Sequence, residues 1–253
     1  MQTALSQEYY KLLHKKLTWF APGIIVGLML LMPLTFNDPH WLVMANFGSS
    51  QWILLVLVIV GATLFSMEIQ HNTILTLLYK APNRRIIYLA KLIVLFGYNI
   101  VLHLFALGLT ILFNTLAIGG HANWLTTYQY HQSLLTNTIM TATIDLGMSL
   151  MLIGFLFLLS CLLTNNAVVI TTSITIVFMG QALSSKLLNE HPQFGSWLKF
   201  NPLNMLNLTF QYANYPVYHK LTQLTNGQLL LGTLGYAVLF LWLGNWCFKR
   251  RHF

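Results

Sequence analysis

The chain has 253 residues, of which 56% are hydrophobic and only 7% are charged, and its mean hydropathy is +0.65. An average soluble domain has about a quarter of charged residues, so this composition excludes an ordinary soluble protein and indicates a chain that resides in lipid. The formal net charge of +8 is a topology signal and attracts anionic lipid; it gives no support to a nucleic-acid partner, and we expect none.

The first predicted element is an amphipathic helix at residues 1–17. Leu5, Tyr9 and Leu12 fall on one helical face, and Lys11 and Lys15 fall largely on the other. This pattern is typical of a helix that lies in the membrane interface, with its lysines toward lipid phosphates. A simple basic anchor for the first span, with no further role, explains the pattern equally well.

Six apolar stretches then approach the length of about 20 residues that an α-helix needs to cross the hydrocarbon core. The fifth is diluted by threonine and serine, whose hydroxyls can bond to the preceding turn or to a neighbouring helix. The predicted spans are residues 19–36, 52–67, 86–118, 139–163, 167–187 and 229–248.

Basic residues are distributed unevenly around these spans. Of the 13 lysines and arginines, all but three precede span one, surround the connection between spans two and three, or follow span six. Basic flanks stay in the cytoplasm, so both termini are expected there. The three exceptions are Lys186, Lys199 and Lys220.

Residues 67–91, with the sequence MEIQHNTILTLLYKAPNRRIIYLAK, form a polar and basic island between two apolar runs. Ile74, Leu77 and Leu78 have the i, i+3, i+4 spacing of one helical face. Pro82 lacks an amide hydrogen and should end that helix. So patterned a hairpin favours a docking element for a cytoplasmic partner.

After this proline, Asn83 can cap the next helix, whose first turn contains Arg84 and Arg85. Cations at a helix N-terminus oppose the helix dipole, which favours anions there by a few tenths to about 1 kcal/mol each. Another group must therefore favour these arginines. Lipid phosphate and acidic groups on a partner both satisfy that condition.

The island also carries a family resemblance. Its acidic residue, Asn-Thr pair, leucine pair, proline, basic residue and later Ala-Lys-Leu resemble the signature of ABC-2 type permeases. The resemblance is to the small group that exports, or confers immunity to, lantibiotics and related peptide antibiotics. These motifs stand here as Glu68, Asn72-Thr73, Leu77-Leu78, Pro82, Arg84 or Arg85, and Ala90-Lys91-Leu92.

The resemblance implies a half-transporter in a bacterial cell membrane, in which residues 68–85 form a cytoplasmic coupling helix that binds a separate ABC ATPase subunit. It implies two copies of that ATPase, a second permease subunit that is identical or homologous, and an antimicrobial peptide or other amphipathic substrate. The residues expected to dock the ATPase are Glu68, Asn72, Thr73, Leu77, Leu78, Pro82, Arg84 and Arg85.

The chain contains no G-x-x-x-x-G-K-[ST] loop, so we expect no nucleotide site or other cofactor on it, and ATP and Mg²⁺ belong to the partner ATPase. The expected fold class is an all-α integral membrane protein in one domain, residues 1–253. It comprises six transmembrane helices, an N-terminal interfacial helix, and a cytoplasmic coupling helix between spans two and three.

Residues 188–226 form a long external segment that is rich in Tyr, Phe and Trp, with Pro192, Pro202 and Pro216 as helix breakers. Aromatic side chains with polar groups prefer the bilayer interface, so we expect the segment to lie on or dip into the outer leaflet. The family resemblance suggests re-entrant helices that gate the exit. A surface loop anchored by aromatics is the alternative.

Two ionisable residues, His103 and Asp145, are expected inside the spans. A charge in hydrocarbon is costly and usually faces a cavity or a partner. If spans three and four are antiparallel neighbours, the two side chains can pair in or beside a translocation path. A buried pair that only fixes helix packing is the alternative.

Catalytic interpretations have little support. Glu68-x-x-His71 has the spacing of half a di-iron site, but no second copy exists, and no hydrolase or protease motif occurs. We therefore expect no catalytic residues and no metal site, and an enzyme acting inside the membrane ranks third. The second function that we consider is a non-transporting membrane scaffold or sensor that docks a cytoplasmic partner.

Overall fold

The computed structural model describes residues 2–71, 73–75, 83–190 and 195–251, and the regular secondary structure of these ranges is helical. Six helices are long and apolar enough to cross a membrane, which confirms the predicted fold class. They are α2 (Lys16–Thr35), α4 (Ser49–Gln70), α6 (Arg84–Thr115), α7 (Leu134–Leu162), α8 (Asn166–Glu190) and α13 (Asn226–Arg250).

Several of these helices begin a few residues before the predicted spans, because polar side chains cap them. The Ser133 hydroxyl accepts a hydrogen bond from the amide of Thr136 and starts α7, and Thr225 and Gln228 form a capping box at the start of α13. Helix α6 has 32 residues and is therefore about 48 Å long. That length exceeds the hydrocarbon core of about 30 Å, so α6 is inclined or extends beyond it.

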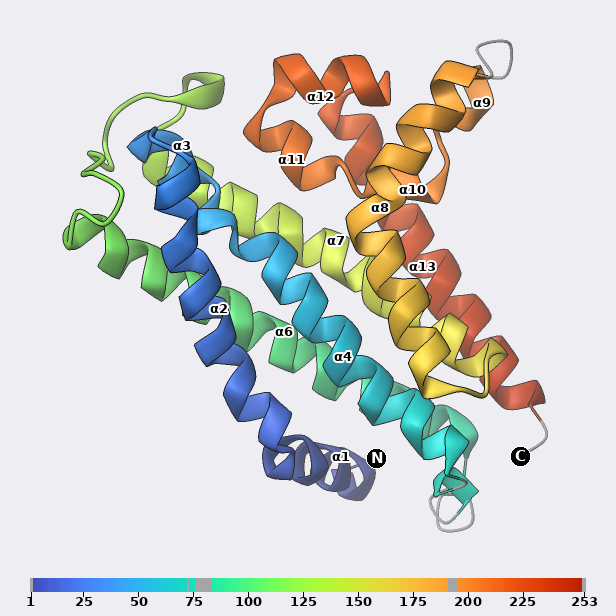
Figure 1. Ribbon diagram of the computed structural model, residues 1–253. Coiled ribbons are helices and arrows are strands. Elements are labelled where there is room, and N and C mark those ends of the chain that lie inside the picture. Colours follow the sequence, from blue (N-terminus) through green and yellow to red (C-terminus); the bar gives the residue numbers. More distant parts are fainter. Residues whose placement is uncertain (1, 72, 76–82, 191–194, 252–253) are drawn as a thin grey trace.

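Shorter helices lie at the two ends of the bundle. Helix α1 (Gln2–His14) and both chain ends lie at one end, which we call the termini end, and the remaining short helices lie at the other (Figure 1). Those at the opposite end are α3 (Pro39–Met44), α9 (Gly195–Leu198), α10 (Pro202–Met205), α11 (Leu208–Ala213) and α12 (Tyr215–Thr222), with the 3₁₀ turns η1 (Asn46–Gly48) and η2 (Gln129–His131).

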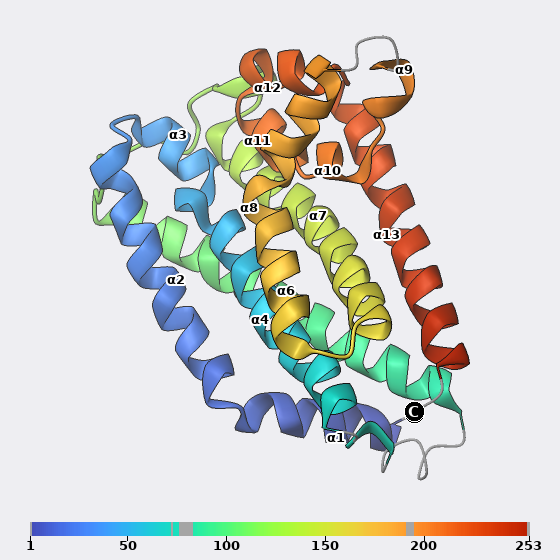
Figure 2. The same cartoon turned by 45° about the vertical axis from the view of Figure 1, so that its right-hand side comes forward.

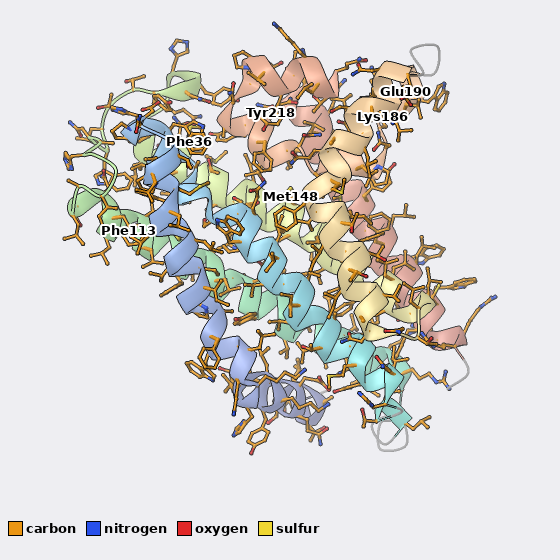
Figure 3. All side chains as sticks on the ribbon, viewed as in Figure 1. Phe36, Phe113, Met148, Lys186, Glu190 and Tyr218 are labelled. Atoms are coloured by element: carbon orange, nitrogen blue, oxygen red, sulfur yellow. The ribbon has the colours of Figure 1, made fainter. Side chains whose placement is uncertain are left out.

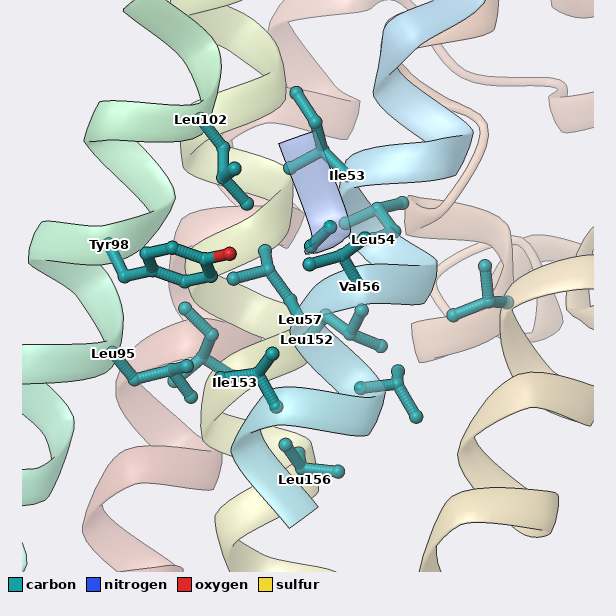
Figure 4. Packing of buried hydrophobic residues seen from close by; sticks show 14 of the residues in the cluster. Ile53, Leu54, Val56, Leu57, Leu95, Tyr98, Leu102, Leu152, Ile153 and Leu156 are labelled. Carbon is teal, nitrogen blue, oxygen red and sulfur yellow. The ribbon is translucent and has the colours of Figure 1, made fainter. Parts of the chain in front are cut away.

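The core of the bundle is formed by α4, α6 and α7. Leu57 of α4, Leu95 of α6 and Leu152 of α7 are buried in one apolar cluster (Figure 4). Helix α7 also packs closely against α13, and Gly154 makes this approach possible. A Cβ built on Gly154 would lie 3.3 Å from the backbone nitrogen of Leu241, so a larger residue would push the two helices apart.

Within the predicted external segment, the short helices α9 to α12 form a layer over the ends of α7, α8 and α13 (Figure 2). Pro202 and Pro216, which we expected to break helices, stand in the first turns of α10 and α12, where a missing amide hydrogen costs nothing. Pro192 lies outside the described residues. Helix α11 contacts α7 and α13, so the layer is attached to the membrane helices.

Candidate functional site

The end of α4 and the start of α6 lie at the termini end (Figure 1). Glu68 stands in the last turn of α4, and the hydroxyl of Thr73 donates a hydrogen bond of 3.3 Å to its backbone carbonyl. Four of the residues predicted to dock an ATPase lie outside the described part of the chain, so the helical form of the coupling segment stays a prediction. These four are Asn72, Leu77, Leu78 and Pro82.

The two arginines that follow this connection have different surroundings. The predicted cap of α6 is confirmed, because the Asn83 side chain accepts a hydrogen bond of 2.9 Å from the amide of Arg85. The Arg84 guanidinium donates to the backbone carbonyls of Lys249 and Arg251, at 3.1 and 2.7 Å. The carbonyl end of a helix favours a cation, so the end of α13 explains why Arg84 is favoured here. The side chain of Arg85 is exposed.

Four charged side chains from α1, α4 and α6 form a closed ring of ion pairs. The Lys11 Nζ lies 2.8 Å from one oxygen of Glu8 and 2.8 Å from one oxygen of Glu68. The Lys91 Nζ lies 2.8 Å from the other oxygen of Glu8 and 2.6 Å from the other oxygen of Glu68. We call these four residues the ion-pair ring.

Lys91 is the most buried member of the ring, with a side chain that is 0% exposed. Its three N–H groups are all used, because it also donates to the backbone carbonyl of Leu64 at 2.9 Å. A buried ion without partners costs several kcal/mol, whereas here every proton has an acceptor. At Lys11, burial lowers the pKa, but hydrogen bonds and attraction to Glu68 and Glu8 outweigh it and leave the pKa raised.

The ring corrects two expectations. We expected only His103 and Asp145 to be ionisable residues inside the spans, but Lys91 lies within α6 and Glu68 within α4. We also expected the lysines of the first helix to face lipid phosphates. Lys11 instead binds Glu8 and Glu68, and Lys15 donates to the backbone carbonyl of Thr63 at 2.8 Å.

The two faces of α1 have different surroundings. Glu8 and Leu12 are its buried residues, while Leu5, Tyr9 and Leu13 line an apolar groove of about 850 Å³ that α1 shares with α2 and α6. Tyr9 is 56% exposed, as expected for an aromatic side chain at a membrane interface.

His103 lies further along α6 than Lys91, and it forms the predicted pair with Asp145 of α7. The Nε2 of His103 lies 2.8 Å from the Oδ2 of Asp145, and its Nδ1 lies 2.9 Å from the backbone carbonyl of Asn99. Both ring nitrogens therefore face acceptors. The geometry requires a proton shared between imidazole and carboxylate, whether as an ion pair or as two neutral groups. Its place in a translocation path stays a prediction.

A third member of this cluster comes from the external segment. The Thr209 hydroxyl of α11 donates to the Oδ1 of Asp145 at 3.0 Å, and the Tyr212 hydroxyl of the same helix donates to the side-chain oxygen of Asn137 on α7 at 3.2 Å. Sequence analysis did not identify Thr209. The hydroxyl side chains of α7 were a signal of a polar helix face, but nothing in the sequence identified their partner.

Comparison with known proteins adds to this geometry. An uncharacterized membrane protein, YdbK, of Bacillus subtilis (strain 168) is 27% identical over 199 residues, which cover 77% of this chain and 75% of the relative. Residues 4–180 match the family described as ABC-2 family transporter protein. This match includes the whole ion-pair ring, His103 and Asp145. Because it extends over more than half of the sequence, the chain belongs to the ABC-2 family of transporter membrane proteins.

Proposed function

We propose that this chain is the membrane-spanning permease subunit of an ATP-driven exporter in a bacterial cell membrane, and that a separate ABC ATPase hydrolyses ATP. Membership of the ABC-2 family supports the membrane role. Both termini lie at one end of the bundle together with α1, the end of α4 and the start of α6 (Figure 1). Basic residues gather at that end, and by the positive-inside rule this supports a cytoplasmic location for it.

The observation that carries this proposal is the position of the α4–α6 connection. Glu68, in the last turn of α4 before this connection, forms an ion pair of 2.6 Å with Lys91 of α6, so the two helices that flank the connection are fixed to each other. Ile74, within the connection, is buried, whereas Arg85 at its end is exposed. A segment anchored at both ends can receive force from a partner without unfolding.

The partners follow from the family and the resemblance. Two ATPase subunits and a second permease copy, identical or homologous, would complete the transporter, and rigid-body movement of the permeases would alternate access across the membrane. The substrate that we propose is an antimicrobial peptide or another amphipathic compound that partitions into the bilayer. His103 and Asp145 are our candidates for the translocation path.

The test is recovery of the ATPase from native membranes with the tagged chain, in mild detergent. Leu77→Asp places a charge on the proposed docking face and should lower the ATPase recovered per permease by about tenfold, the effect expected for an interface residue of high importance. Vanadate-sensitive ATP turnover in the recovered complex should fall in proportion.

The matched control is Leu125→Asp, the same substitution at a side chain that is 80% exposed. Leu125 belongs to the connection between α6 and α7, which lies at the opposite end of the bundle (Figure 1). It should leave recovery unchanged. Equal ATPase recovery with Leu77→Asp and wild type would contradict the docking assignment. A wild-type chain that is recovered alone and without ATP turnover would instead favour a scaffold or sensor.

A further inference from the structure

Helix α1 is attached to the bundle through charge as well as through apolar contacts. Among its described residues, Leu12 is the one apolar side chain that is buried, and the other buried residue is Glu8. Glu8 and Lys11 together make three ion pairs in the ring, one to each other, one from Lys11 to Glu68 and one from Glu8 to Lys91. Apolar contacts alone therefore give α1 a small anchored surface.

The ring joins α1 to the start of the proposed coupling segment and to the helix that follows it. Glu68 is the first residue of that segment, and Lys91 lies two turns into the helix that follows it. Glu8 divides its two oxygens between Lys11 and Lys91, and Glu68 does the same. A displacement of the segment therefore acts on Glu8 and Lys11 of α1 at the same time.

On its other side, α1 borders the apolar groove of about 850 Å³. Leu5, Tyr9 and Leu13 face this groove from α1, and Gly97 and Val101 face it from α6. A Cβ built on Gly97 would meet no atom within 4 Å, so this wall of the groove is open. A movement of α1 toward the groove therefore enters space that the described residues leave open.

The corner between α1 and α2 is held by side-chain bonds to the last turn of α1. The Thr18 hydroxyl donates to the backbone carbonyl of Leu12 at 2.7 Å, and the Trp19 indole donates to that of Leu13 at 2.7 Å. Since both donors belong to α2, this corner transmits a displacement of α1 to the first span.

We propose that the ion-pair ring is a positioning device of the transport cycle, which makes α1 move as one body with the end of α4 and the first turns of α6, so that α1 carries the displacement caused by the ATPase to α2. The inference rests on the proposed function. Glu8 and Lys91 act in it by holding α1 in place and touch neither substrate nor nucleotide.

The experiment measures distances by pulsed electron paramagnetic resonance in the reconstituted permease–ATPase complex, with Cys161 and Cys247 replaced. One pair of spin labels, at the exposed positions 3 and 73, reports α1 against the segment. A second pair, at positions 3 and 126, reports α1 against the opposite end. Between the nucleotide-free and vanadate-trapped states, the first distance should stay constant and the second should shift.

Glu8→Gln removes the charge with little change in shape. It should make the 3–73 distance change on trapping and should abolish the shift of the 3–126 distance, while ATP turnover continues. Glu8→Asp keeps the charge and should retain the wild-type behaviour. If Glu8→Gln does not fold, Lys11→Met opens the ring at its most exposed member, 32% exposed, and should act in the same direction.

Lys186→Met is the matched control, because it removes an exposed ion pair of 3.6 Å between Lys186 and Glu190 of α8 (Figure 3). It should change neither distance. Two results would overturn this inference while leaving the proposed function intact. One is a 3–73 distance that stays constant on trapping in a Glu8→Gln complex that still hydrolyses ATP. The other is a wild-type 3–73 distance that shifts on trapping. A chain that recruits no ATPase overturns the proposed function and this inference with it.

Discussion

Helix α6 contributes to two buried clusters of charge, and they are built on different principles. Near the termini end, the ion-pair ring joins two lysines and two carboxylates from three helices, and each ammonium is shared by both carboxylates. Deeper in the bundle, His103 and Asp145 form a single pair, and Asp145 also accepts a hydrogen bond from the Thr209 hydroxyl.

The difference lies in how each cluster tolerates the loss of a partner. A histidine can give up its proton near neutral pH and remain buried as a neutral ring. Lysine and carboxylate side chains, by contrast, ordinarily titrate far from neutral pH. The ring therefore requires all its members, while the His103–Asp145 pair can adapt. This contrast suits a rigid link at one site and an adjustable polar contact at the other.

The largest effect should come from breaking the ring at its buried member. Lys91→Met leaves Glu8 and Glu68 with Lys11 alone, so we expect a loss of about 3–5 kcal/mol in the free energy of unfolding, as for other buried pairs that lose one ion. Unfolding of the purified protein in detergent measures it.

A more specific test of the ring combines Glu8→Gln with Lys91→Met. The double variant keeps one carboxylate and one ammonium, Glu68 and Lys11, at their distance of 2.8 Å, so it should recover part of the loss. A double variant less stable than Lys91→Met would show that the ring is not held by charge balance.

A smaller effect should follow at the deeper cluster. Asp145→Asn leaves an amide that can still accept from Thr209, and His103 can become neutral, so we expect a loss of about 1–3 kcal/mol. Hydrogen exchange of α11 should quicken as well, because Thr209 belongs to that helix. A loss as large as that of Lys91→Met would refute the contrast between the two clusters.

The smallest effect concerns Lys15, next to the ring. Burial lowers its pKa from 10.5 to about 8, so between these two values the unfolded chain binds more protons than the folded one. The free energy of unfolding should therefore rise as the pH increases from 8 to 10.5. Because the side chain is only partly buried, we expect a rise of a few tenths to about 1 kcal/mol.

Thermal unfolding of wild type and Lys15→Met across this pH range isolates the contribution of Lys15. The difference between the two proteins should change with pH in the direction stated, and the variant should show the flatter profile. A difference that is constant from pH 8 to 10.5 would mean that Lys15 keeps an ordinary pKa.

The spans were predictable because hydropathy and length alone determine which segments can cross a bilayer. The ends of these helices were less predictable, because a helix continues into polar residues until a capping side chain ends it. Span four was expected to begin at residue 139, but Ser133 caps a helix that starts at Leu134.

The two charge clusters show the limit of such reasoning at the site. His103 and Asp145 were identified together because each needs a partner in hydrocarbon, and adjacent spans supply one. Glu8 and Lys91 are separated by 83 positions, and Lys91 resembles an ordinary basic flank of a span. Only packing of α1 against α6 brings the two together, which local sequence does not encode.

The closed form of the ring also constrains natural sequence variation. Replacing Glu8 alone leaves Lys91 with one carboxylate, so a neutral residue at position 8 should be accompanied by a neutral residue at position 91. Among relatives, an acidic and a basic member of the ring should thus be lost together, even though the four positions belong to three separate stretches of the chain.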